Sequence, residues 1–131
     1  MVAEIARTQE AKEALKSSDF VRFGQLMNAS HDSLDADFEV SCDELNECVK
    51  IARATEGVLG SRMSGGGFGG CTVTLVQAAH ADTLLKNFAE KYSGYEKDAA
   101  FKTAPGAGAG AFRFPDAPWQ AGEADAKPAT E

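Results

Sequence analysis

The run from Gly65 to Gly70 constrains the fold most, because five of its six residues are glycine and it separates two strand-like segments. Val58–Met63 before it and Cys71–Val76 after it are rich in apolar and β-branched residues, which favours β-strands. A plain hairpin turn needs only one or two glycines. The excess removes Cβ atoms where a ligand or another backbone approaches, and successive N–H groups can form an anion-binding nest. The glycine content alone therefore leaves open a phosphate-binding loop or a tight structural linker.

Two common phosphate motifs do not fit this loop. No Lys-Ser or Lys-Thr follows the last glycine, as a P-loop requires. The dinucleotide-binding fingerprint leads into a helix, whereas the segment after Gly70 has the composition of a strand.

Helical patterns precede and follow the loop. Residues 2–16 are rich in helix formers, and residues 19–34 follow a possible cap at Asp19 and carry a broad apolar stripe. This stripe consists of Phe20, Phe23, Leu26, Met27, Ser30 and Leu34. Ser41 with Glu44 predicts a capping box for a third helix that ends near Gly57, and residues 79–92 predict a fourth.

The order of these elements predicts an α+β domain with a small, mainly antiparallel sheet and helices packed on one face. We expect residues 71–76 to form a central strand and residues 99–103 a last strand with Phe101 inward. The predicted domain is 1–104, and the low-complexity segment 105–131 is predicted to be a disordered tail.

Composition excludes several classes of function. The 131 residues carry a formal net charge of -7, which disfavours nucleic acid and anionic membranes as partners. No apolar run is long enough to span a bilayer and the N-terminus does not read as a signal peptide, so we expect a cytoplasmic protein. Cys42, Cys48 and Cys71 lack metal-ligand spacing and are expected to be reduced core thiols, so no metal site is predicted.

Several separate segments resemble the C-terminal part of GHMP kinases, and the galactokinase form most closely. Ser61–Cys71 is similar to the third motif of that family. Further similar stretches occur in the expected order, namely Ala6–Thr8, Phe23–Met27, Ser30–Leu34, Asp37–Ser41 and Glu44–Leu45. The resemblance covers about residues 4–104 and implies the ferredoxin-like type of fold.

The resemblance implies a function for the loop. Galactokinases transfer the γ-phosphoryl group of ATP, with Mg²⁺, to the 1-hydroxyl of galactose in galactose catabolism. Their N-terminal lobe supplies the sugar motif, a phosphate loop and the acting Asp and Arg, and their third motif borders the phosphates. The resemblance thus assigns a phosphate and nucleotide site to Ser64, Gly65, Gly66, Gly67, Phe68, Gly69 and Gly70, and no catalytic residue. The N-terminal motifs do not occur here, so the chain alone is predicted to be inactive and to need that lobe as its partner.

Other residues carry narrower expectations. His31 is assigned to the polar side of its helix, with a structural hydrogen bond rather than catalysis. Arg62 reaches either a phosphate or a carboxylate such as Glu56 or Asp37, and Phe68 is expected to act as a hydrophobic pin. Valine at Gly66 or Gly67 is expected to leave folding nearly unchanged, because these glycines serve a close approach.

Three alternatives stay open at this point. The first is a kinase for N-acetylgalactosamine. The second is a galactokinase-like sensor that binds galactose, ATP and a regulatory partner. The third is a pseudoenzyme domain that makes only protein contacts.

Overall fold

The computed structural model describes residues 2–96 and 99–106. Its elements are α1 (Val2–Lys16), α2 (Phe20–Ala36), α3 (Asp43–Arg53), β1 (Val58–Ser64), β2 (Cys71–Val76), the short 3₁₀ helix η1 (Ala78–His80) and α4 (Ala81–Lys91). The helices and strands predicted before residue 92 are confirmed within a few residues. Most of the predicted tail, residues 107–131, lies outside the described residues. None of the described helices has the length and apolar character needed to cross a membrane.

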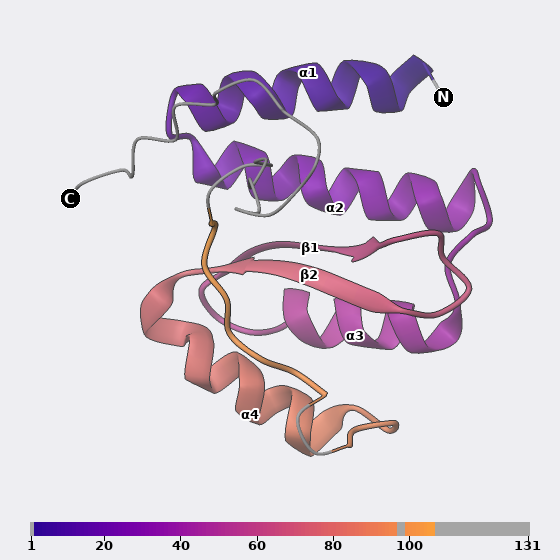
Figure 1. The fold of residues 1–131 in the computed structure, drawn as a ribbon, viewed down its shortest axis with the longest axis vertical. Helices are drawn as coiled ribbons and strands as arrows, with labels where there is room; N and C mark the ends of the chain where they lie inside the picture. The colour runs from indigo at the N-terminus through magenta and orange to yellow at the C-terminus, as the bar shows by residue number, and fades with distance from the viewer. Residues whose placement is uncertain (1, 97–98, 107–131) are drawn as a thin grey trace, which may run out of the picture.

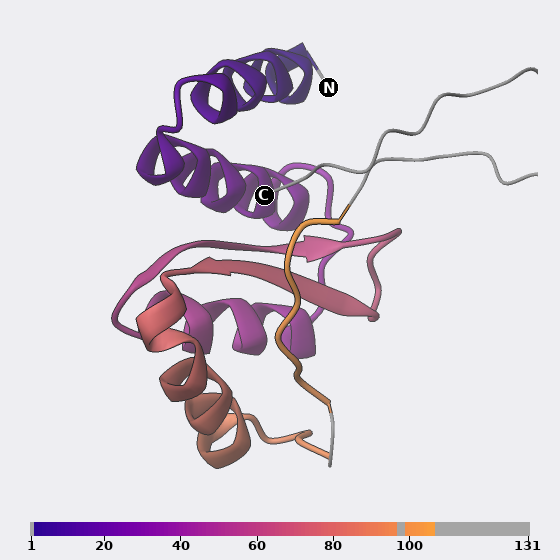
Figure 2. The ribbon, with the colours of Figure 1, turned by 60° about the vertical axis from the view of Figure 1, so that its left-hand side comes forward.

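The sheet is a hairpin of β1 and β2, paired antiparallel from Ser64 opposite Cys71 to Val58 opposite Val76. Figure 1 shows α1 and α2 stacked on one side of the hairpin and α3 and α4 on the other, and Figure 2 shows the same layers after a 60° turn. α3 contacts both strands, and α4 packs against α3. The predicted α+β class, with a small antiparallel sheet and helices against it, is confirmed.

The core lies between α3, α4 and the open ends of the two strands. Ala52, Leu84 and Phe88 are buried there, and Val58 and Val76 pack against them. Burying a leucine or phenylalanine side chain fully stabilises a fold by about 1.5–3 kcal/mol, so this cluster joins α4 to the hairpin.

α2 and β1 make an unusually close contact through two glycines. A Cβ on Gly24 would overlap the carbonyl oxygen of Leu59, and a Cβ on Gly60 would overlap that of Gly24. The helix therefore turns its Gly24 side to the strand. Phe20, the first residue of α2, is half exposed. Its predicted place in a buried stripe was wrong.

The capping box predicted at Ser41 was also wrong, because α3 begins at Asp43 with Cys42 as its N-cap. The Ser41 hydroxyl instead donates to Asn46 Oδ1 at 2.7 Å. Hydrogen bonds from its own N–H, and then from the Cys42 side chain, lower the pKa of Glu44. An ionised carboxylate in the first turn stabilises a helix through its dipole.

Three further expectations fail around the sheet. β2 has β1 as its single strand neighbour in the described part of the chain, so it is not central. Residues 99–103 form no strand, and the Phe101 side chain is 79% exposed instead of inward. The neighbouring Lys102 forms an ion pair with Asp82 of α4 at 2.7 Å, which ties this segment to a helix rather than to a sheet edge. Cys71 is exposed rather than buried in the core.

Candidate phosphate-binding loop

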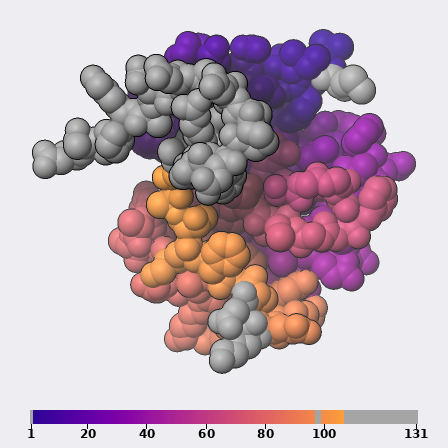
Figure 3. All heavy atoms as spheres, in the orientation of Figure 1, coloured from indigo at the N-terminus to yellow at the C-terminus, as the bar shows by residue number. Residues whose placement is uncertain are grey.

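The glycine loop projects from the far end of the hairpin, where β1 ends and β2 begins (Figure 1). In the space-filling view this end of the hairpin, in pink, lies at the surface (Figure 3). Positive φ values occur at four loop glycines and at Phe68, at +58°. The loop thus has the left-handed backbone in which consecutive N–H groups can turn toward one ligand.

Among the residues that the structure describes, one backbone hydrogen bond outside the strand ladder holds the tip of the loop. The N–H of Phe68 donates to the carbonyl oxygen of Val40 at 2.8 Å. Val40 belongs to the segment between α2 and α3, so the residues after α2 brace the loop.

Gly66 and Gly67 differ in what they permit, contrary to the expectation that valine is tolerated at both. No atom lies within 4 Å of a Cβ built on Gly66, and its φ is not left-handed. Gly67 has a φ of +87°, and a Cβ there would overlap the carbonyl oxygen of Val40. Gly67 is therefore required by the bracing contact, whereas Gly66 lies beside open space.

The side chain of Phe68 does not act as the predicted pin. It is 75% exposed, and the loop is held by the Phe68 backbone instead. A non-glycine residue at positive φ is uncommon and costs about 1–2 kcal/mol. The Val40 hydrogen bond offsets part of this cost.

Arg62 and Ser64 flank the loop on its β1 side. The Arg62 Nε donates to the carbonyl oxygen of Met63 at 3.0 Å. Neither of the predicted partners, Glu56 and Asp37, pairs with it, and Arg62 has no ion pair within residues 2–96 and 99–106. Ser64 is exposed at the start of the loop. A cation and a hydroxyl thus stand beside the glycines.

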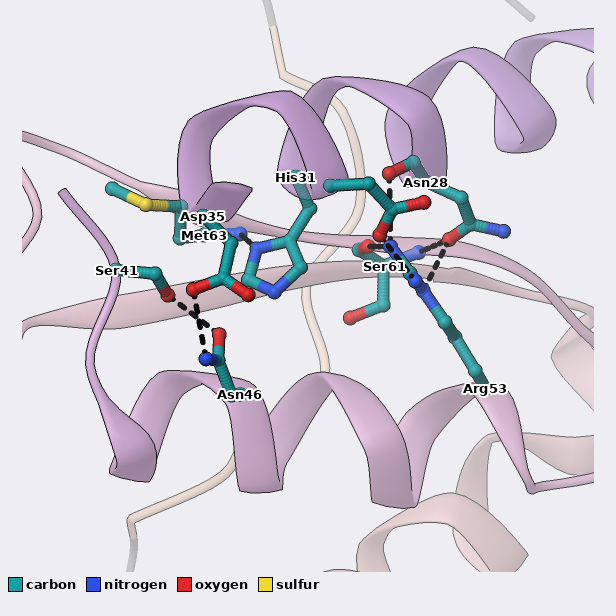
Figure 4. Close-up of polar contacts among 9 residues, drawn as sticks. Asn28, His31, Asp35, Ser41, Asn46, Arg53, Ser61 and Met63 are labelled. Atoms are coloured by element: carbon teal, nitrogen blue, oxygen red, sulfur yellow. Dashed lines mark hydrogen bonds and ion pairs between the residues drawn. The ribbon is translucent and has the colours of Figure 1, made fainter. Parts of the chain in front are cut away.

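The base of the loop is held by α2. The N–H groups of Ser61 and Met63 point away from β2, because these residues occupy the non-hydrogen-bonded pairs of the ladder. Asn28 Oδ1 accepts from Ser61 N at 2.9 Å, and His31 Nδ1 accepts from Met63 N at 3.2 Å (Figure 4). Asn28 and His31, one helical turn apart on α2, thus accept the hydrogen bonds that a neighbouring strand would accept at this edge of β1.

Arg53, which the sequence did not single out, joins three elements at this point. From the end of α3 it donates to Asn28 Oδ1 at 2.9 Å, to Asp32 Oδ1 at 2.7 Å and to the carbonyl oxygen of Ser61 at 3.3 Å (Figure 4). The available signal was the polar pair Asn28 and Asp32, four residues apart on a helix with an apolar face. A pattern of that kind does not identify its partner.

His31 is buried, with 4% of its surface exposed, and not on the polar side of α2 as predicted. Its predicted structural hydrogen bond is confirmed by the contact with Met63. Burial lowers the pKa of His31 most and the positive Arg53 next, while Asp32 and Asp35 act in the opposite direction. The ring is therefore neutral at pH 7, as an accepting Nδ1 requires.

A shallow pocket of about 360 Å³ lies between α3 and the loop. Its lining includes Glu44, Leu45, Cys48, Phe68, Gly69, Gly70, Thr72 and Tyr92. Burial raises the pKa of the Cys48 thiol, so this group is a poor nucleophile at neutral pH. The ionised Glu44 disfavours a phosphate group in this pocket.

The family described as "GHMP kinases C terminal" matches residues 11–94. The chain belongs to this family. Galactokinases of Homo sapiens and Bos taurus are 52% and 51% identical to it over 94 residues, which make up 72% of this chain and 24% of each relative. The galactokinase of Fusobacterium nucleatum is 47% identical over 91 residues. The chain thus spans about a quarter of the length of the curated relatives it matches.

Parts of two solved kinase structures share the fold. A Lactococcus lactis galactokinase complexed with galactose aligns with a TM-score of 0.64 and 40% identity, covering 66% of this chain and 22% of that one. An L. major mevalonate kinase in complex with R-mevalonate aligns with a TM-score of 0.61 and 37% identity, covering 67% and 27%. The same domain is therefore similar to parts of kinases that bind different substrates.

Proposed function

We propose that this domain is the C-terminal lobe of a galactokinase, in which Ser64–Gly70 borders the phosphates of ATP. The observation that carries the proposal is the identity of about 50% to galactokinases over 94 residues. The open loop, braced from behind by Val40, supports it, because an exposed set of backbone N–H groups suits an anion. Arg62 stands beside the loop without a carboxylate partner in the described chain and is the cation that we assign to the phosphates.

The proposed reaction is ATP-dependent phosphorylation of galactose to galactose 1-phosphate, with Mg²⁺ on the phosphates. Phosphoryl transfer depends on positioning and on charge stabilisation, so a phosphate-bordering loop contributes by orienting groups rather than by forming bonds. The acting residues, the sugar site and the metal ligands are assigned to the remaining three quarters of a galactokinase. We accordingly assign no catalytic residue to this chain and place the activity in the cytoplasm.

The domain alone is expected to release no ADP in response to galactose, because the residues that would act on the sugar lie elsewhere. A coupled ADP-release assay on the folded, monodisperse chain measures this. Galactose-dependent turnover that disappears in Gly66→Val would contradict the assignment, because it would place a complete site within these residues.

A chimera tests the function directly. The matching 94 residues of the human galactokinase are replaced by those of this chain, and galactose-dependent ADP release is measured with the parent enzyme as reference. We expect activity within about tenfold of the parent, equivalent to about 1.4 kcal/mol in transition-state binding. Gly66→Val in the chimera should fold and lose most transfer, because its side chain fills the open space beside the loop. A folded chimera without activity would refute the proposal.

A further inference from the structure

The strongest unexplained feature of the molecule is a buried histidine that bonds to the strand leading into the glycine loop. His31 Nδ1 accepts the N–H of Met63, two residues before Gly65, and Met63 itself is 1% exposed. Within residues 2–96 and 99–106 this N–H has no strand partner on that side, and Met63 is almost fully shielded from solvent. Its hydrogen bonding therefore depends on His31.

α2 and the residues that follow it hold the loop at two points. His31 binds the base at Met63, and Val40 binds the tip at Phe68. Between these points, a Cβ on Gly65 or Gly66 would have no atom within 4 Å. The strand pairing of Ser64 with Cys71 closes the loop, and these two attachments hold it against α2 and the residues that follow α2.

We infer that His31 is a positioning residue for the glycine loop, which it holds only while its Nδ1 is unprotonated. A proton on Nδ1 turns the acceptor into a donor that faces the N–H of Met63. Two donors cannot share a hydrogen bond, and a buried unsatisfied N–H is destabilising. Protonation therefore releases the base of the loop, whichever anion the loop binds.

The groups around His31 set the pH at which this happens. Burial opposes the charged ring most and Arg53 from α3 next, while Asp32 and Asp35 on its own helix and the Asn46 side chain of α3 favour it. Asp35 accepts a hydrogen bond from Asn46 of α3, and Arg53 pairs with Asp32, so each carboxylate is already engaged. From α1, Glu4 accepts from Ser30, the residue before His31. From β1, the group that contacts His31 is the Met63 amide, which does not titrate.

Hydrogen exchange of the nitrogen-15-labelled 131-residue chain tests the inference from about pH 8 to about pH 4.5, which spans the ordinary histidine pKa of about 6.5. Protection of the Met63 and Phe68 amides is divided by that of Ala52, which is fully buried in α3 and reports global opening. We expect both ratios to fall about tenfold as His31 protonates, equivalent to about 1.4 kcal/mol. Long-range proton–nitrogen correlations should place the proton of the neutral ring on Nε2.

Three variants test separately what the His31 side chain contributes as a hydrogen-bond acceptor, as a titrating charge and as a packed group. His31→Gln keeps an oxygen acceptor that does not titrate, so its ratios should stay high and independent of pH. His31→Leu removes the acceptor and should show low ratios at every pH. His80→Gln changes the other histidine, which has no hydrogen bond to the loop in the described part of the chain, and should behave like the parent.

The inference fails if either protection ratio stays constant while His31 titrates, or if the neutral ring carries its proton on Nδ1. It also fails if His31→Gln keeps the pH dependence of the parent. Should His31→Leu not fold, the titration of the parent chain and the glutamine variant still decide.

Discussion

Alanine at Gly67 should destabilise the domain, whereas alanine at the adjacent Gly66 should not. Gly67 has a φ of +87°, where an L residue costs about 1–2 kcal/mol. The new Cβ also overlaps the carbonyl oxygen of Val40, the acceptor for Phe68. Displacing that oxygen weakens a hydrogen bond worth about 1 kcal/mol.

Together these effects amount to about 2–3 kcal/mol, and Tm should fall by about 8–24 °C, because 1 kcal/mol moves Tm by about 4–8 °C in a domain of this size. Gly66→Ala meets no atom within 4 Å and has no left-handed φ. It should leave Tm unchanged or raise it slightly, since alanine lowers the entropy of the unfolded chain by an amount worth about 0.4–1 kcal/mol.

Thermal unfolding followed by far-ultraviolet circular dichroism, with urea unfolding at one temperature, measures both variants against the parent. The two positions are neighbours in one exposed loop, so each variant is the matched control for the other. Equal melting temperatures for Gly66→Ala and Gly67→Ala would refute the reasoning, because they would show that the Val40 contact does not hold the loop.

Three further outcomes are expected. Arg53→Ala should lower the free energy of unfolding by about 2–3 kcal/mol in urea titrations, because the hydrogen bonds of Arg53 join α3, α2 and β1. Arg22→Ala is the control: it breaks an exposed ion pair and should lower the free energy of unfolding by less than about 1 kcal/mol. Phe68→Ser should reduce the binding of a hydrophobic dye, since this side chain is 75% exposed; unchanged fluorescence would count against it. Because folding lowers the pKa of His31, the unfolded state binds more protons below about pH 6.5, and stability should decrease as pH falls through that range. His31→Gln should remove this part of the pH dependence, and a parent-like pH profile in the variant would contradict it.

The sequence by itself determined the order and type of the elements before residue 92 and the location of the loop. Apolar periodicity identified α3 and α4, whose buried faces include Leu45, Val49, Leu84 and Phe88. The glycine run between two β-branched segments predicted the hairpin and its unusual connection. These features are local, because they depend on the spacing of residues within one element.

Tertiary structure alone decided how the loop is held. Gly24 and Gly60 look like ordinary residues of a helix and a strand, yet their missing side chains let α2 reach the edge of β1. That contact buries His31, which the helical pattern had placed among polar residues. The packed structure also decided that the fold requires glycine at position 67 but not at position 66, because the Val40 carbonyl group lies against Gly67 and no atom lies within 4 Å of a Cβ on Gly66. Contacts between residues far apart in the chain leave no periodic trace in the sequence, so only the packed structure shows them.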